Sequence, residues 1–297
     1  MNNPKVNIIM NCYNGEKYLK EAIESVFSQT YKNWELIFWD NCSSDNSARI
    51  INSYNDDRII YQKSKKHTSQ YEARHQAVLH CKREFIAFLD VDDWWDKHKL
   101  EKQLKLFDNI NVGFTSTNYW LIRQNKNKKK AKVFKKIPNG FILSKLLIQN
   151  FIGMSSLIFR KKSYLELEYG FNSKYEIVGD YDLVLRMSLN NEFASIQEPL
   201  SYYRWHEQNL SHKIQKNANE LKLMVKDMRK NKSFYLNENF EFFADFSIYL
   251  SSLGYKLNNN LGEAINEAKK INNFFLKLRI FSIIILPLKI IKILRPS

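Results

Sequence analysis

Residues 84–95 read EFIAFLDVDDWW, an apolar run that ends abruptly in three closely spaced carboxylates. A short apolar run bounded by polar residues predicts a buried strand over 84–90. If the extended backbone continues beyond it, the two-residue period of side chains puts Asp90 and Asp92 on one side. Two neighbouring carboxylates repel each other unless a cation or strong donors compensate. A hard divalent ion is the simplest solution, and oxygen ligands favour Mg²⁺ or Mn²⁺ over a thiolate-binding metal.

Strand-like runs alternate with helix-like patterns on both sides of this stretch. Four further strands are expected at VNIIMNC (6–12), WELIFWD (34–40), RIIYQ (58–62) and VGFTS (112–116). Helices are expected over 16–29, over 45–54 with Asp45 as N-cap, and from a Ser69/Glu72 capping box towards Cys81. This alternation predicts an α/β fold with a mainly parallel central sheet and helices on both faces. Ligands of such sheets bind beyond the carboxyl ends of the strands.

Polar residues stand at those carboxyl ends. The first strand leads into Asn11 and Tyr13, and the second ends at Asp40. For Asp40, Asp45 and Asp93, each taken alone, helix capping or turn formation is as good an explanation as a functional role.

The composition indicates a folded protein from a reducing compartment. The chain has 297 residues, of which 44% are hydrophobic, so intrinsic disorder of the whole chain is excluded. Its three scattered cysteines do not suit a disulfide framework or a cysteine-based zinc site. The first residues lack the basic, apolar and small-residue pattern of a secretory signal.

The net charge of +15 is concentrated in two segments. Residues 123–136 hold eight basic and no acidic side chains, and residues 212–297 hold fifteen basic and seven acidic ones. A nucleic-acid-binding protein more often spreads basic and aromatic residues over one main face. Localised charge indicates an anionic partner met by two patches, and a membrane surface fits as well as a polynucleotide. Of the two, we predict an anionic membrane surface and no nucleic acid.

Several stretches together resemble an inverting family-2 glycosyltransferase with the A-type nucleotide-sugar (nucleotide-diphospho-sugar transferase) fold. In the family's order they are NIIMNCYNGEKYLKEAIESVFSQTYKNWELIFWDNCSSDNS, ARHQAV, FLDVDDWWDKHKLEKQL, GDYDLVLRMS and PLSYYRWHEQNLS. These stretches cover about residues 5–211. A match of several stretches in the family's order is more specific than an isolated DxD motif. The resemblance predicts a catalytic domain over 1–211, followed by a helical region over 212–297.

The resemblance also implies a donor pocket. Asn11, Tyr13 and Asp40 would line the nucleoside site, with Asp40 accepting a hydrogen bond from the base. Arg74, in the ARHQAV stretch, matches the family's arginine beside the nucleotide.

Four further residues receive roles at the diphosphate and the acceptor. Asp90 would face the ribose or metal side of the donor, and Asp92 would ligate the Mn²⁺ or Mg²⁺ ion that bridges the diphosphate. His206 matches a position that assists metal binding. Asp180, in GDYDL, matches the catalytic base. The residue-based alternatives are a surface helix position for Arg74, an ordinary histidine for His206 and a helix cap for Asp180.

The chain departs from the family pattern at five positions. Asn11 replaces the usual threonine or proline, Asn41 replaces a second aspartate, and His75 replaces a frequent asparagine. Cys42 stands where glycine is common, and Gly179 replaces the glutamate that generally precedes the base. Because of these changes, the resemblance does not decide the identity of the nucleotide or the contacts to the acceptor. A transferase fold without catalytic activity also stays an alternative.

After residue 211 the pattern changes to helices and ends in LKLRIFSIIILPLKIIKILRPS (276–297). Its longest charge-free stretch is nine residues, 280–288. A spanning helix needs ~20 residues, and Pro287 would kink this one. Apolar residues interspersed with basic ones suit a segment lying in the interface of an anionic leaflet. The alternative is a helix that packs in a core or forms an oligomer.

The prediction is a metal-dependent inverting glycosyltransferase that uses a nucleotide-sugar donor, preferably a UDP-sugar. Its acceptor would be a glycan or lipid-linked glycan in bacterial surface polysaccharide or glycoconjugate synthesis. It would be cytoplasmic and peripheral at the cytoplasmic face of the membrane. One alternative is a nucleotidyltransferase, which needs an early glycine-rich phosphate loop, whereas residues 1–45 contain only Gly15. The other is a non-enzymatic basic nucleic-acid-binding protein.

Overall fold

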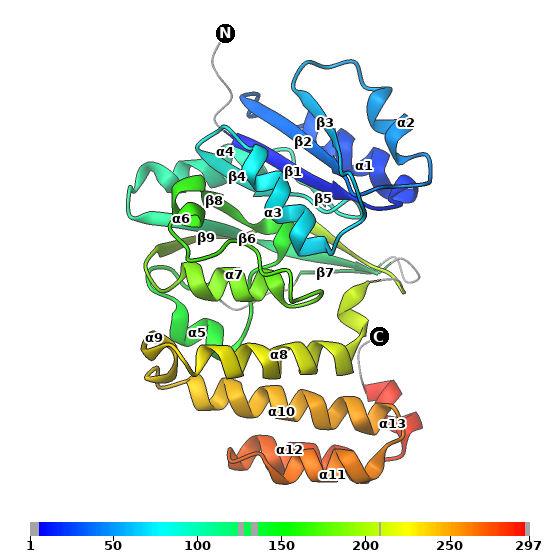
Figure 1. Ribbon diagram of the computed structural model, residues 1–297, viewed down its shortest axis with the longest axis vertical. Coiled ribbons are helices and arrows are strands. Elements are labelled where there is room, and N and C mark those ends of the chain that lie inside the picture. Colours follow the sequence, from blue (N-terminus) through cyan, green and yellow to red (C-terminus); the bar gives the residue numbers. More distant parts are fainter. Residues whose placement is uncertain (1–5, 124–127, 132–135, 208, 295–297) are drawn as a thin grey trace. The chain divides into compact units, whose positions relative to one another are not determined.

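The computed structural model describes residues 6–123, 128–131, 136–207 and 209–294 (Figure 1). The chain divides into two compact units. The first unit comprises residues 1–143 and 151–206, and the second comprises 144–150 and 207–297. The assignment of a catalytic role to 1–211 and of a separate role to 212–297 stays a prediction.

The first unit contains the sheet. Its strands are β1 (Val6–Cys12), β2 (Trp34–Asp40), β3 (Ile59–Lys63), β4 (Phe85–Phe88), β5 (Trp94–Trp95), β6 (Val112–Arg123), β7 (Lys128–Ala131), β8 (Ile158–Arg160) and β9 (Glu192–Trp205). Its helices are α1 (Glu16–Phe27), α2 (Ser47–Asn52), α3 (Gln70–His80), α4 (Lys99–Leu104), α6 (Lys161–Leu165) and α7 (Gly179–Met187), with 3-10 turns η1 (Lys105–Asp108) and η2 (Met154–Ser156).

The strand order is β3-β2-β1-β4-β8-β6-β9-β5, with β7 paired to β6. Strands β1 to β4 are mutually parallel where they pair, and β6 runs parallel to β9. The short strand β8 is antiparallel to both β4 and β6, and β5 is antiparallel to β9. The predicted α/β class with a mainly parallel sheet is therefore confirmed, with antiparallel pairs added in its second half.

Both faces of the sheet are covered. Side chains two apart along β1, namely Val6, Ile8 and Met10, join one core with Leu19 and Ile23 of α1. Figure 1 shows α3 and α7 in front of the sheet. The predicted capping box begins α3, because the Ser69 side chain accepts a hydrogen bond from the Glu72 amide. The N-cap of α2 is Asn46 rather than Asp45, so the predicted start is one residue early. The Asp45 carboxylate still accepts from the Ser47 amide in the first turn, and also from the Glu16 amide.

Strand β4 is shorter than the sequence predicts, and this changes the geometry of the carboxylates. It ends at Phe88, and the chain then turns, with the Asp93 amide 3.0 Å from the Asp90 carbonyl. Ser155 holds this turn, since its hydroxyl accepts from the Asp90 amide (3.2 Å) and donates to Asp93 (2.6 Å). The expectation of an extended backbone through Asp92 is wrong. We name residues 90–93 the DVDD turn.

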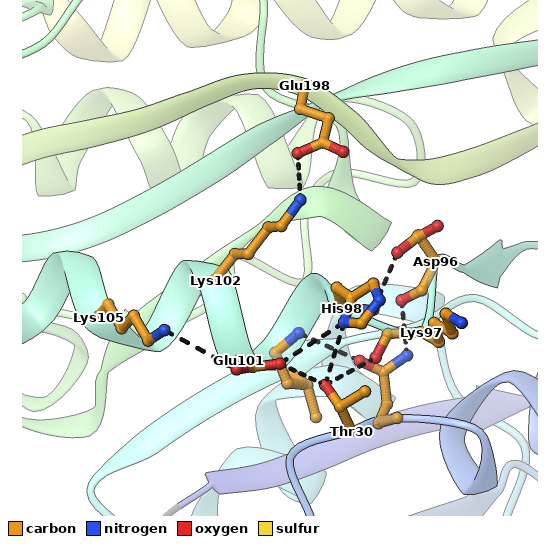
Figure 2. Close-up of polar contacts among 10 residues, drawn as sticks. Thr30, Asp96, Lys97, His98, Glu101, Lys102, Lys105 and Glu198 are labelled. Carbon is orange, nitrogen blue, oxygen red and sulfur yellow. Dashed lines mark hydrogen bonds and ion pairs between the residues drawn. The ribbon is translucent and has the colours of Figure 1, made fainter.

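A polar network fixes the chain that follows this turn (Figure 2). The Thr30 amide donates to the Lys97 carbonyl (2.8 Å), and its hydroxyl donates to Glu101 (2.7 Å). Lys102 of α4 pairs with Glu198 of β9 at 2.5 Å. The segment after the DVDD turn is thereby attached both to the end of α1 and to β9.

The second unit is helical, as the sequence predicts. It contains α5 (Leu143–Ile148) from residue 144 on, η3 (Leu210–His212), α8 (Ile214–Met228), α9 (Lys232–Tyr235), α10 (Phe240–Leu257), α11 (Leu261–Lys269), α12 (Phe274–Ile285) and α13 (Leu288–Leu294). Helix α12 buries Leu276, Ile280 and Ile284 in a core with α10 and α11. Leu286 and Pro287 separate α12 from α13. Within the described ranges, no helix has both the length and the apolar character needed to cross a membrane.

Candidate active site

The loops after β1 and β2 form one side of the site. Asn14 and Cys42 lie in the left-handed region, with φ of 54° and 66°. Because glycine adopts this region without strain, the geometry explains why glycine suits position 42. The Asn14 amide donates to the Ser43 hydroxyl (3.0 Å), and the Ser44 amide donates to Asn14 Oδ1 (2.8 Å). The two loops therefore support each other.

Asp40 lies beneath these loops. Its side chain is fully buried. One carboxylate oxygen accepts from the Ser43 amide (2.7 Å), and the other accepts from the Tyr61 hydroxyl (2.8 Å). Asp40 therefore shapes the loop, and the direct contact with a base that the resemblance implies stays a prediction.

Asn11 and Tyr13 have the features of ligand-binding side chains. Among the described residues, neither the amide nitrogen nor the amide oxygen of Asn11 has a hydrogen-bond partner, although both atoms are buried. Buried polar groups are nearly always paired, so this unpaired amide is unusual. The nucleoside-binding role that the resemblance implies for Asn11 stays a prediction. Tyr13 is 54% exposed, which excludes a core position, and its ring lies 4.1 Å from that of His67.

Asn41 has a structural role in the same region. Its amide donates to the Thr68 carbonyl (2.9 Å) and accepts from the Thr68 amide (3.1 Å). An aspartate at this position would lack the donor, so the asparagine fits the segment that carries His67.

Arg74, Asp90 and Asp180 come together although they are far apart in the sequence. Arg74 of α3 is buried and forms an ion pair with Asp90 at the start of the DVDD turn. Removal from water raises the pKa of both Asp90 and Asp180, and the guanidinium of Arg74 acts against this in both. A buried arginine near two carboxylates favours their ionised forms. Because Arg74 is buried, the alternative of a surface helix position for it is wrong.

Asp180 has one anchored oxygen and one open oxygen. Its Oδ1 accepts from the Tyr181 amide (2.8 Å) and from the Tyr71 hydroxyl (3.2 Å). Oδ2 accepts no hydrogen bond from the part of the chain that the structure describes. Asp182 differs, because its carboxylate is buried and binds Arg186 Nε (2.9 Å) and Nη2 (2.6 Å). Of these two carboxylates, the geometry of Asp180 suits proton transfer.

Asp92 and His206 form a second pair, with 2.9 Å between Asp92 Oδ2 and His206 Nε2. Arg204 holds this pair in place. Its amide donates to Asp93 (2.9 Å), its Nε donates to the Asp92 carbonyl (2.8 Å), and its guanidinium lies 4.4 Å from the Trp94 ring. Arg204 is not among the predicted site residues, although it stands two residues before His206 in the stretch PLSYYRWHEQNLS.

The donor set fits a divalent ion only if substrate completes it. No cluster of three or more histidine, cysteine or acidic side chains suits a metal within the described residues. Because Asp90 pairs with Arg74, Asp92 and His206 are the side chains that remain for an ion, and here they bind each other. Mg²⁺ commonly binds through one or two protein carboxylates together with water and substrate phosphates. Asp92 would supply one such carboxylate, and the metal role of His206 stays a prediction.

Comparison with known proteins identifies the family of the chain. The model of Glycosyl transferase family 2 matches residues 7–167. The chain is 32% identical over 191 residues to the Escherichia coli UDP-Glc:alpha-D-GlcNAc-diphosphoundecaprenol beta-1,3-glucosyltransferase WfgD, covering 64% of this chain and 72% of that protein.

Two solved structures share the fold. S. aureus TarS 1-349 in complex with UDP-GlcNAc superposes with a TM-score of 0.68 at 16% identity, covering 89% of this chain and 81% of that one. The mannosyltransferase PcManGT from Pyrobaculum calidifontis, in complex with GDP-Man and Mn²⁺, superposes with a TM-score of 0.63 at 14% identity, covering 95% and 79%. At these identities the likeness concerns the fold.

Proposed function

Because the chain belongs to glycosyl transferase family 2, we propose that it transfers a sugar from a UDP-sugar to a lipid-linked glycan in bacterial surface polysaccharide or glycoconjugate synthesis. Family membership makes it a glycosyltransferase of an inverting family, in preference to a nucleotidyltransferase or a nucleic-acid-binding protein. The E. coli relative, named for UDP-glucose and a diphosphoundecaprenol-linked GlcNAc, supports the proposed donor and acceptor classes. The observation that carries the proposal is Asp180, with Oδ1 anchored and Oδ2 open beside the Arg74–Asp90 pair.

Inversion needs one in-line displacement at the anomeric carbon and one base. Asp180 Oδ2 takes the proton of the acceptor hydroxyl as that oxygen attacks. Its Oδ1 stays bound to the Tyr181 amide, so the carboxylate keeps its orientation during the transfer. Arg74 favours the ionised carboxylate before the attack.

The donor is bound on the other side of the site. The Asn11 amide offers a donor and an acceptor, which match the alternating acceptors and N–H of a uracil edge. Asp40 holds the loop above it, and Tyr13 with His67 borders the pocket.

Asp92 and His206 would hold Mn²⁺ or Mg²⁺. When bound, such an ion neutralises the charge that develops on the departing diphosphate. Arg204 keeps Asp92 in place through its carbonyl and through the neighbouring Asp93. The Mn²⁺ in the PcManGT complex supports a metal requirement.

A direct assay tests the reaction. Purified protein should convert radiolabelled UDP-glucose and α-GlcNAc-diphosphoundecaprenol into a glycolipid that thin-layer chromatography separates. Chelation by EDTA should abolish this conversion, and added Mn²⁺ or Mg²⁺ should restore it, because the charge of the leaving group needs compensation. Full turnover without divalent ions would contradict the metal requirement. Turnover only with another nucleotide sugar would correct the donor.

We also propose a peripheral position at the cytoplasmic face of the membrane, which rests on α12. Phe274, Leu278 and Ile285 are 69%, 60% and 81% exposed and lie on one face at helical spacing. The opposite face packs in the core, so the core-packing alternative describes that face, and the membrane-interface reading is proposed for the exposed face alone. Exposed apolar residues gathered on one face mark interaction sites. The nearby Lys277 and Arg279 suit anionic lipid.

Point variants of α12 test this surface better than truncation, because α12 also stabilises the helical core. Phe274→Glu with Leu278→Glu should weaken binding to phosphatidylglycerol vesicles about tenfold or more, since burying one large apolar side chain contributes roughly 1.5–3 kcal/mol. Sedimentation with vesicles at low salt measures the effect. The control is Ile110→Glu with Leu165→Glu, a pair 79% and 57% exposed in the other unit. Equal vesicle binding by both double variants would contradict the proposal.

A further inference from the structure

Tyr71 lies directly behind the proposed base. It belongs to α3, is 2% exposed, and its ring stacks on Phe171 with 5.8 Å between centroids. Its hydroxyl lies 2.8 Å from the Ile177 carbonyl and 3.2 Å from Asp180 Oδ1. A phenol has one proton to donate, so these two acceptors share it. Both acceptors belong to the segment that enters α7.

Gly179 makes this arrangement possible. A Cβ atom at position 179 would lie 2.5 Å from Cδ2 of Tyr71, closer than real contacts allow. The Tyr71 ring is confined by its stacking on Phe171, so it cannot easily move away. The ring of Tyr71 therefore occupies space that a larger residue at position 179 would need. A glutamate at this position, which the family pattern leads one to expect, is incompatible with this placement of Tyr71.

We propose that Tyr71 is the positioning residue of the base: its hydroxyl holds Asp180 Oδ1 so that Oδ2 is presented to the acceptor hydroxyl. Gly179 admits its ring, and the two residues form a matched pair in this chain. This inference rests on the proposed role of Asp180 and extends it to a residue that contacts no substrate.

The hydroxyl is suited to this task throughout the reaction. Burial and the neighbouring Asp180 hold the pKa of Tyr71 well above its usual value, so the phenol stays a donor. Its hydrogen bond favours the ionised carboxylate and thus lowers the pKa of Asp180, against the effect of burial. After Asp180 has accepted a proton, the phenol still has the Ile177 carbonyl as acceptor, so no buried polar group is left unpaired.

Tyr71→Phe keeps the ring and removes the hydroxyl. With UDP-glucose and α-GlcNAc-diphosphoundecaprenol, we expect kcat to fall about tenfold, as the loss of a hydrogen bond to a charged group predicts. The KM for UDP-glucose should not change, and the acidic limb of the kcat profile should move to higher pH because the carboxylate loses a stabilising donor. Gly179→Ala should lower kcat similarly, because its methyl group displaces the ring.

Tyr164→Phe is the matched control. Tyr164 packs against the same Phe171 at 5.8 Å, and its hydroxyl binds the Phe171 amide (3.0 Å) and His75 (2.7 Å). This variant removes a buried hydroxyl from the same aromatic cluster and leaves the Tyr71–Asp180 contact in place. We expect its kcat and pH profile to stay close to wild type. An unchanged pH profile in Tyr71→Phe, or the same shift in both variants, would overturn the positioning role.

A second measurement does not depend on activity. In protein labelled with ¹³C at aspartate carboxyls, the Asp180 signal is assigned by its absence in Asp180→Asn. Its titration should move to higher pH in Tyr71→Phe and stay in place in Tyr164→Phe. If wild-type protein turns over no nucleotide sugar, the proposed function fails, and this titration alone tests the role of Tyr71. No movement in Tyr71→Phe would overturn the inference.

Discussion

We expect Asp180→Asn to lower turnover at least ~10²-fold, the usual contribution of a positioned general base, while the affinity for UDP-sugar and metal should stay at the wild-type level. An amide has nearly the shape of a carboxylate but cannot take the proton of the acceptor hydroxyl. The hydrogen bonds from Tyr71 and the Tyr181 amide can persist at the remaining oxygen, so the fold should tolerate the change. Steady-state kinetics measures the loss, and calorimetric titration with UDP measures binding.

Asp182→Asn is the control for this result. Asp182 pairs with Arg186, which also donates to the carbonyls of Tyr169 (2.6 Å) and Gly170 (2.7 Å). Its loss should lower the melting temperature by weakening the attachment of α7, with little effect on turnover of the folded enzyme. If the Asp180 variant turned over at a near-normal rate and Asp182 proved essential, the catalytic base would be Asp182 instead.

Asp92→Asn should abolish the gain in UDP affinity that Mn²⁺ provides. A metal contributes several kcal/mol of charge stabilisation, so we expect wild-type affinity to rise on the order of 10²-fold with Mn²⁺ and the affinity of the variant to stay constant. The neutral amide is a weaker ligand for a hard cation and no longer balances its charge. Calorimetric titration of UDP with and without Mn²⁺ measures the difference.

Asp93→Asn tests whether any carboxylate of the DVDD turn has this effect. Asp93 is buried between the Ser155 hydroxyl and the Arg204 amide. Burial and the neighbouring Asp92 hold its pKa well above the usual value, so a neutral side chain suits the site. This variant should keep the Mn²⁺-dependent gain. Mn²⁺-supported UDP binding by Asp92→Asn at wild-type strength would refute the metal assignment.

The sequence predicts best those elements whose causes are local. Strands β1 and β2 match their predicted ranges of 6–12 and 34–40, because apolar runs and polar boundaries both lie within a few residues. The start of α3 follows from Ser69 and Glu72, three positions apart. The end of β4 could not be predicted, because the hydroxyl that holds the DVDD turn belongs to Ser155, 65 residues from Asp90.

The same difference between local and distant causes applies to the residues of the candidate site. Its carboxylates are recognisable because each stands beside a motif or at a strand end. Arg204 does stand in a motif, but neither its sequence nor that of Tyr71 reveals the partner, since Asp92 and Asp180 are 112 and 109 residues away. Only the folded chain shows that a tyrosine in α3 anchors an aspartate in α7.

The wide spacing of the Asp92–His206 pair has a consequence for biosynthesis. A span of 114 residues separates the two side chains, and translation at ~5–20 residues per second needs roughly 5–25 s to cover it. Strand β5, which follows Asp92, lies at the end of the strand order and pairs with β9, so the nascent chain has no partner for it until residues 201–202 leave the ribosome. The emerging polypeptide lacks His206 throughout that interval, and it lacks Asp180 for most of it. With the roles proposed above, the complete site would therefore exist only once β9 has joined the sheet.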